Sequence, residues 1–222
     1  MAMKTAKYEH VRGQMKPGDV IAFGGKGHFS EIIKMATLSS VSHVATILQT
    51  KILEDKGKRY FNQVIESTSL NDFNGVSISR LSDRLTDYEG DVWWLPLRKD
   101  LCMDVEAQEK FYDFLFDKAK RRVRYDTPQA IKSALDALDQ LPFETHGPTY
   151  NKEDFSKFFC SELVAAGLEI AGVVGSVNAS EVTPIDLCRW GIFEEDYYQL
   201  KVDKDLKEIT RFNTLDPALW NK

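Results

Sequence analysis

The order of apolar segments along the chain predicts an α+β fold in a single domain. Short apolar runs typical of strands dominate the first hundred residues, segments with helical spacing follow, and another strand-like run comes near the end. Strands and helices that occur in separate blocks are typical of α+β domains. Because the 222 residues contain no internal repeat and no low-complexity linker, we expect one domain, 1–222, in which residues 1–14 are flexible.

Turn residues and apolar runs place the strands. A turn signal of proline, glycine and aspartate at 17–19 precedes an apolar run at 20–23. A strand at 42–48 is followed by a polar, glycine-containing loop at 54–58 and by a return strand at 60–67, which together predict a hairpin. Further strands are expected at 76–80, 91–97 and 193–202.

Apolar spacing and boundary residues place the helices. Thr127 supplies an N-cap and Pro128 the first helical position of one helix, and Gly172 ends the last. The segment 141–154 contains two prolines and a glycine and is predicted to be a loop. The predicted helices cover 29–38, 105–122, 128–140 and 158–171.

Composition and charge limit the functional classes. Hydrophobic residues make up 43% and charged residues 28% of the chain, which is ordinary for a folded protein and excludes global disorder. The net charge of −5 argues against a general nucleic-acid binder. A basic cluster closes the helix at 105–122, where cations favour the helix dipole, so we expect no nucleic-acid partner. The cluster consists of Lys118, Lys120, Arg121, Arg122 and Arg124.

The spacing of the cysteines indicates whether the protein binds a metal or another cofactor, and the lack of long apolar segments indicates its compartment. Cys102, Cys160 and Cys188 follow no zinc-binding or CxxC spacing, so we expect no metal, no cofactor and no disulfide framework. Free thiols suit a reducing compartment. No signal-peptide core and no stretch of about 18 apolar residues is present. We expect a cytoplasmic protein without a membrane span, although a leader removed earlier would leave the same sequence.

Cys160 is the first candidate for chemistry. It lies at the start of the apolar helix at 158–171, where backbone N–H groups without partners and the helix dipole favour a thiolate. The alternative is a small buried core residue, which is what most free cysteines are. Cys102 and Cys188 are interpreted as structural or incidental.

His43 is the best candidate for a base beside a cysteine nucleophile, which needs an imidazole to take its proton. It opens the strand at 42–48, so a rigid element would hold the ring. His28 follows a glycine-rich loop and is a weaker candidate, while His10 and His146 lie in segments expected to be frayed or exposed. The alternative for His43 is a core histidine whose hydrogen bonds are satisfied.

Glu66 is expected to orient His43 across the predicted hairpin. If the loop is centred between positions 54 and 55, residues that face each other have numbers that sum to 109, which places Glu66 directly opposite His43. A loop centred one residue later leaves the two residues as diagonal neighbours on the same face. A half-step shift would put Glu66 on the other face. The alternative for Glu66 is a solvated strand carboxylate.

Five short motifs occur in an order that resembles the circularly permuted NlpC-type cysteine hydrolases, the YiiX-like branch of the papain-like superfamily. The histidine strand precedes the cysteine helix, as in the permuted branch. The resemblance covers roughly residues 15 to 190 and implies a papain-like core, in which a cysteine helix packs on an antiparallel sheet or small barrel. The motifs are at 17–20, 42–44, 64–67, 159–163 and 183–187.

The resemblance also implies roles for individual residues. Cys160 matches the nucleophile, His43 the base and Glu66 the third residue, which orients the base. Tyr125, in the segment that resembles the tyrosine-aspartate segment of the family, and Ser161, beside the cysteine, are candidates for substrate binding. Tyr125 is equally well explained as a packed aromatic residue ahead of a helix.

These residues predict a thiol hydrolase, an amidase or peptidase that cleaves an amide bond, with a cell-wall-type peptide as a candidate substrate. A lipid ester is the alternative substrate, as in the related lecithin:retinol acyltransferase-like branch. A non-catalytic binding module is the alternative class. We expect no substitution at Cys160, His43 or Glu66 to unfold the protein, because each acts at a site and does not fill the core. The sequence indicates no oligomeric state.

Overall fold

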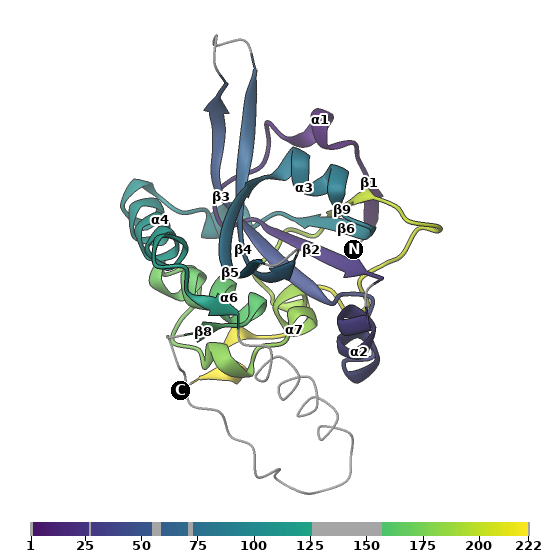
Figure 1. Ribbon diagram of the computed structural model, residues 1–222. Coiled ribbons are helices and arrows are strands. Elements are labelled where there is room, and N and C mark those ends of the chain that lie inside the picture. The colour runs from purple at the N-terminus through teal and green to yellow at the C-terminus, as the bar shows by residue number, and fades with distance from the viewer. Residues whose placement is uncertain (1, 27, 55–58, 71–72, 126–156, 222) are drawn as a thin grey trace, which may run out of the picture.

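The computed structural model describes residues 2–26, 28–54, 59–70, 73–125 and 157–221. Figure 1 shows a mixed α+β arrangement in which a seven-stranded sheet packs against helices, so the predicted fold class is confirmed. The predicted helix at 128–140, the predicted loop at 141–154 and His146 lie outside the described residues.

The sheet is antiparallel except at one end. Its strand order is β1-β9-β6-β2-β3-β4-β5, and only the pairing of β1 with β9 among these described strands is parallel. The histidine strand β3 therefore lies near the middle of the sheet, between β2 and β4. The strands are β1 (Met3–Thr5), β2 (Val20–Gly25), β3 (His43–Leu53), β4 (Tyr60–Leu70), β5 (Phe73–Arg80), β6 (Gly90–Leu95) and β9 (Tyr197–Lys201).

Helices cover both faces of this sheet. Alternate side chains of β2 enter two different cores: Val20 and Ala22 join the core beneath α4, α6 and α7, whereas Ile21 and Phe23 join the core beneath α1 and α3. This alternation follows from the two-residue period of a strand. The helices are α1 (Tyr8–Val11), α2 (His28–Ala36), α3 (Leu81–Asp87), α4 (Val105–Lys120), α6 (Cys160–Ile170) and α7 (Pro184–Arg189).

Short elements complete the described fold. The two-residue strand β7 (Arg124–Tyr125) pairs in parallel with β8 (Lys157–Phe158), directly ahead of α6. Three single-turn 3₁₀ helices lie at Lys99–Leu101, Ala179–Glu181 and Pro217–Trp220.

The first fourteen residues, which the sequence predicted to be flexible, pair and pack with distant parts of the chain. Residues 3–5 add a parallel strand to β9, and α1 places Tyr8 and Val11 in the core with exposures of 5% and 7%. The main-chain N–H of Asn62 donates to the Tyr8 hydroxyl, and the Asn62 amide donates to the carbonyl of Arg12. The sequence did not indicate these contacts, because the segment is polar and each of its partners lies in a distant part of the chain.

The last strand is also shorter than predicted. The sequence predicted a strand at 193–202, but β9 covers only residues 197–201. Phe193 makes an isolated antiparallel bridge with Leu97 instead. Phe193 and the residues of β9 therefore belong to two separate pairings.

The register between β3 and β4 differs from the predicted one in a way that preserves the face of each side chain. Thr46 lies opposite Ile65, a sum of 111, so continuing the register places Glu66 opposite Ala45 and diagonal to His43. Two irregularities between residues 47 and 52 each add one residue to β3. A single extra residue would have put His43 and Glu66 on opposite faces of the hairpin, whereas two extra residues leave them on the same face.

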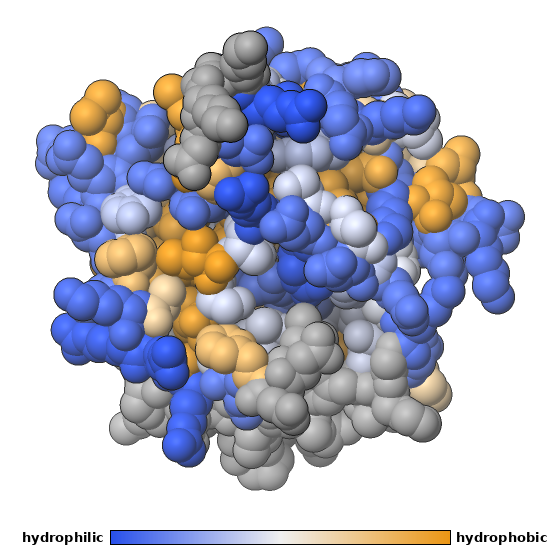
Figure 2. Space-filling model, turned by 45° about the horizontal axis from the view of Figure 1, so that its top comes forward, coloured by the Kyte–Doolittle hydropathy of each residue, from blue (hydrophilic) through white to orange (hydrophobic). Residues whose placement is uncertain are grey.

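Figure 2 shows one face of the molecule, on which hydrophilic side chains predominate and apolar side chains gather in patches between them. No helix in the described ranges is long and apolar enough to cross a membrane.

Candidate active site

Cys160 is the first residue of α6, as the sequence predicted. The chain enters the helix through Phe159, whose extended backbone (φ −79°, ψ 160°) ends the preceding strand segment. The side chain of Glu162 accepts a hydrogen bond from the Phe159 N–H at 3.1 Å and so closes the first turn. The N–H groups of the first turn have no acceptor within the helix, and Cys160 is part of that turn.

His43 is the first residue of β3 and lies between a carboxylate and this thiol. Its Nε2 is 2.7 Å from Oε2 of Glu66, which is 1% exposed, while the His43 side chain is 14% exposed. Cys160 also acts on the His43 ring, because the interaction with its thiol raises the pKa of His43. Because Nε2 faces Glu66, Nδ1 is the ring nitrogen available to the thiol. The predicted proximity of His43 and Glu66 on one face is confirmed, with the diagonal register in place of the direct one.

Neighbouring charges and hydrogen bonds shift the pKa values of both His43 and Glu66. Burial opposes a charge on His43, but the charge and hydrogen bond of Cys160, followed by those of Glu66, outweigh it and raise the pKa of His43 to about 9. Burial likewise opposes a charge on Glu66, but hydrogen bonds and charges from His43 and Arg84 lower the pKa of Glu66 to about 2. Glu66 is therefore an anion at neutral pH, and the protonated form of His43 is favoured.

Arg84 is the residue of this site that sequence reasoning missed. Its Nε donates to Oε1 of Glu66 at 2.5 Å, and its Nη2 donates to Oε2 at 3.0 Å. This two-pronged geometry matches the planar guanidinium to the planar carboxylate. No local signal could have indicated Arg84, because it lies in the short polar helix α3 and its partner comes from β4.

An aromatic frame holds the charged groups. Phe23 lies directly opposite His43 in the β2–β3 ladder, and their rings are 5.4 Å apart. The guanidinium of Arg84 lies 5.1 Å from the Phe23 ring and 5.2 Å from the Tyr88 ring. The Tyr88 side chain is hydrogen-bonded to Ser42, the residue before the histidine. Phe23 thus touches both the histidine and the arginine that share Glu66.

Lys201 of β9 holds the carboxyl end of α3. Its Nζ donates to the carbonyl groups of Leu85, Thr86 and Tyr88 at 2.7, 3.3 and 2.6 Å. Because the helix ends here, these carbonyls receive no N–H donor from a following turn. A cation at this end also interacts favourably with the helix dipole. The contact fixes the short helix that carries Arg84.

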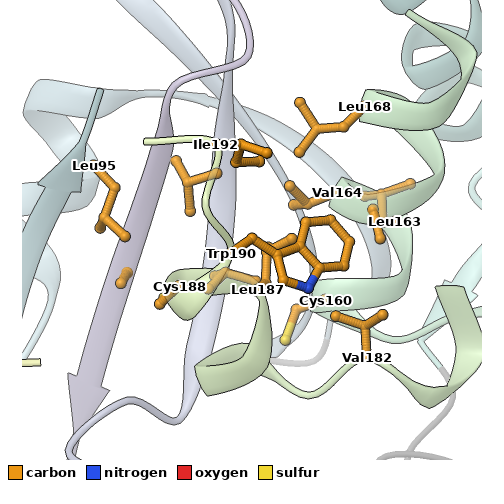
Figure 3. Close-up of a cluster of buried hydrophobic side chains, with 14 of the residues drawn as sticks. Leu95, Cys160, Leu163, Val164, Leu168, Val182, Leu187, Cys188, Trp190 and Ile192 are labelled. Carbon is orange, nitrogen blue, oxygen red and sulfur yellow. The ribbon is translucent and has the colours of Figure 1, made fainter. Parts of the chain in front are cut away.

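The thiol of Cys160 is closed to solvent in this arrangement. Cys160 has no exposed surface and belongs to the core beneath α6. Figure 3 shows it among apolar side chains of α6, α7 and the segment after α7, with the nitrogen edge of the Trp190 indole turned toward it. Cys188 of α7 is buried nearby, and this burial raises the pKa of its thiol. A molecule from solvent can reach Cys160 only after this packing opens.

The two predicted substrate-binding residues have different placements. The main chain of Tyr125 pairs with that of Phe158, two residues before Cys160, so its segment lies beside the start of α6. Ser161 is fully buried, and its hydroxyl donates to the carbonyl of Val182 at 2.5 Å. This bond ties α6 to the segment ahead of α7 and accounts for Ser161 in structural terms.

The other candidate ligands and cysteines lie elsewhere. Cys102 is partly exposed, and the ammonium of Lys16 donates to its sulfur at 3.1 Å. His10 is part of α1, and His28 is the first residue of α2. Among the described residues, no group of three or more histidine, cysteine, aspartate or glutamate side chains could hold a metal ion.

Comparisons with known proteins identify a YiiX-like structure as a neighbour of this chain. No family model matches the sequence, and no curated protein matches it. Among solved structures, the chain is similar to the crystal structure of the metalloprotein yiiX from Escherichia coli O157:H7, with 21% sequence identity and a TM-score of 0.43. The similarity covers 71% of this chain and 67% of that chain.

Proposed function

We propose that the protein is a cysteine-dependent hydrolase that cleaves an amide bond, with Cys160 as nucleophile, His43 as base and Glu66 as the residue that orients the base. One observation carries the proposal: the imidazole of His43 lies 2.7 Å from the Glu66 carboxylate and interacts electrostatically with the thiol of a cysteine at a helix start. A nucleophile, a base within hydrogen-bond reach and a third group on the base are the elements of such a catalyst.

In the first half of the reaction, the Cys160 thiolate attacks the carbonyl carbon of the amide and forms a carbon–sulfur bond. The carbonyl oxygen becomes an anion, which the backbone N–H groups at the start of α6 stabilise. The carbon–nitrogen bond then breaks as protonated His43 gives its proton to the leaving amine. The products of this half are a free amine and a thioester on Cys160.

In the second half, neutral His43 takes a proton from water, and the resulting hydroxide attacks the thioester carbon. The carbon–sulfur bond breaks, and the sulfur leaves as the thiolate beside protonated His43. The carboxylic acid product departs, and the starting charge state is restored. Glu66 remains an anion throughout and holds the ring with Nε2 turned toward itself.

The proposed substrate is a peptide-like amide, with a cell-wall-type peptide as its first candidate. This choice follows the resemblance to permuted NlpC-type hydrolases of the papain-like superfamily. A lipid ester is the alternative, because the same thiolate and base would transfer an acyl group from an ester oxygen.

A second candidate function is a binding module that does not catalyse a reaction. The burial of Cys160, which has no exposed surface, favours this alternative. A buried thiol that fills a core position is the ordinary state of a free cysteine.

Turnover by substituted proteins tests the proposal. The substrates are γ-glutamyl and cell-wall peptides, with short-chain esters as the second panel. Cys160→Ala and His43→Ala should each remove nearly all turnover, and the double variant should lose little more, because nucleophile and base act as a unit. Full turnover by folded Cys160→Ala would end the proposal.

Thiol labelling gives an independent test that needs no substrate. Iodoacetamide near pH 6 should modify Cys160 faster in the wild-type protein than in His43→Ala, as measured by peptide mass spectrometry. A Cys102→Ser background removes the partly exposed thiol beside Lys16, which would otherwise react at the surface. An unreactive Cys160 together with no turnover of either panel would favour the binding module.

A further inference from the structure

We propose that Arg84 is a positioning residue that acts through Glu66 and offsets its charge, so that His43 can release its proton during the reaction. This role rests on the proposed function, because proton release by His43 matters only if the ring serves as an acid. The hydrogen bonds of the Arg84 guanidinium in this site go to one carboxylate, that of Glu66.

The two oxygens of Glu66 are divided between two cations. Arg84 takes Oε1 at 2.5 Å through Nε and shares Oε2 with His43, at 3.0 Å through Nη2. A carboxylate held at both oxygens cannot rotate away from the ring without breaking both contacts with the guanidinium. Oε2, the oxygen that faces His43, makes the longer of the two hydrogen bonds with Arg84, so it can also bind the ring.

The guanidinium is itself held in place. The Arg84 side chain is only 12% exposed, and it lies against the rings of Phe23 and Tyr88. Lys201 holds the end of the helix on which it sits. An arginine retained in such surroundings adds a permanent positive charge next to Glu66, because the guanidinium does not lose its proton in proteins.

The charges around the ring alternate in sign. Arg84 is positive, Glu66 negative, His43 positive when protonated, and Cys160 negative as a thiolate. An unopposed buried anion beside His43 would hold the proton on the ring more tightly and make it a poorer acid. The positive charge on the far side of Glu66 reduces this effect.

Other charged or titratable groups near these residues come from α3 and the residue after it. Asp87 and Tyr88 both act on Arg84 through their charges, and burial raises the pKa of Tyr88 so that its hydroxyl is neutral at ordinary pH. On His43 itself, the groups that act are Cys160 from α6 and Glu66 from β4. Removing the Arg84 charge should therefore change the titration of His43 mainly through Glu66.

The experiment measures the titration midpoint of the His43 ring by NMR in protein labelled with ¹⁵N histidine. Arg84→Gln keeps a donor for Glu66 but removes the charge, and the midpoint should rise by about one pH unit. Arg84→Lys keeps the charge, and its midpoint should stay near that of the wild-type protein. Arg84→Met, which fills similar space without a charge, replaces Arg84→Gln if that variant does not fold.

Arg80→Gln is the matched control, because Arg80 is an exposed cation that pairs with Glu54 and should leave the midpoint unchanged. A midpoint that falls or stays the same in folded Arg84→Gln or Arg84→Met would overturn the inference, since Arg84 would then only hold Glu66 in place or have no influence.

The measurement needs no turnover, so it separates this inference from the proposed function. A rise of the midpoint in a protein that hydrolyses nothing would support the charge effect of Arg84 and contradict the enzyme. Turnover that depends on Cys160, without the rise, would support the enzyme and contradict the role of Arg84.

Discussion

At the scale of single residues, Glu66 decides how the site is built. It is 1% exposed and carries a full charge between a histidine and an arginine. Buried charges of this kind are tolerated because each one is paired. The sequence suggested only the pairing with His43, and we expected that replacing Glu66 would not unfold the protein because it acts at a site.

Glu66→Gln should instead destabilise the protein, because it leaves the largely buried charge of Arg84 without a carboxylate. Loss of one partner of a buried ion pair costs about 3–5 kcal/mol, which urea denaturation would measure. The double variant Glu66→Gln with Arg84→Met should regain most of this stability without regaining activity. A single variant as stable as the wild-type protein would mean that the Arg84 charge is not buried in solution.

The two perturbed pKa values predict how stability varies with pH. The pKa of His43 is raised to about 9 in the folded protein, above its ordinary value of 6.5, so its contribution is fully present below pH 6.5 and is lost as the pH rises through 9. The pKa of Glu66 is lowered from 4.5 to about 2, so its contribution is present above pH 4.5 and is lost as the pH falls through 2.

Urea midpoints at pH 6 and pH 9.5 should therefore differ more in the wild-type protein than in His43→Gln. The difference attributable to His43 is at most about 3–4 kcal/mol, the size of a shift of two to three pKa units. Equal pH dependence in the two proteins would show that His43 does not gain its charged partners on folding.

At the scale of elements, the hairpin β3–β4 brings His43 and Glu66 together only because β3 carries two extra residues. Lys51 lies within the second irregularity and has a φ of 56°, in the left-handed region that disfavours side chains. The bulges are thus a local cost of bringing the two ionisable residues, which share a face with or without them, close enough to hydrogen-bond.

Lys51→Gly should be neutral or should stabilise the protein by up to about 1 kcal/mol, since glycine adopts a positive φ without steric cost. Thr50→Gly is the control: it lies next to Lys51 but is not among the residues with positive φ, so it should destabilise the strand. Chemical denaturation of both variants measures the difference. A loss of stability in Lys51→Gly as large as in the control would contradict the left-handed conformation.

Helix α3, which carries Arg84, also depends on a distant element for its position. α3 is only seven residues long, too short to be stable alone, and Lys201 from β9 binds its last carbonyls. The position of a charged side chain at the site thus depends on a strand that follows it by more than a hundred residues.

At the scale of the whole molecule, the two ends of the described chain meet in the sheet. β1 pairs with β9, and α1 covers the core that also contains Phe23 and Val64. The segment that was expected to be flexible therefore supports the face of the sheet from which Phe23 contacts His43.

Deletion of residues 1–14 should lower the free energy of unfolding by about 3 kcal/mol or more, because it exposes the core around Tyr8 and Val11 and leaves buried Asn62 without two of its partners. Thermal or urea unfolding followed by circular dichroism would measure the loss. A truncated protein with unchanged stability would restore the original expectation of a flexible segment.

The sequence by itself determined the parts of the protein that depend on local patterns. The alternation of apolar residues and the turn at 17–19 located the strands, and the start of the last predicted helix placed Cys160 near a set of free N–H groups. The hairpin arithmetic predicted Glu66 opposite or diagonal to His43 on one face, with a half-step shift to the other face as the alternative. These features depend on residues close together in the chain, so their periodicity is visible without a structure.

Only the tertiary structure decided the features that join distant segments. Three features depend on where another element packs. They are the hydrogen bonds of Arg84 to Glu66, the two bulges that change the register of β3 and the burial of Cys160 in the core. The docking of residues 3–11 has the same cause, since their partners lie on β9 and β4. Such contacts leave no periodic trace in the sequence, because a single polar residue in a short helix looks the same whether it faces water or a buried carboxylate.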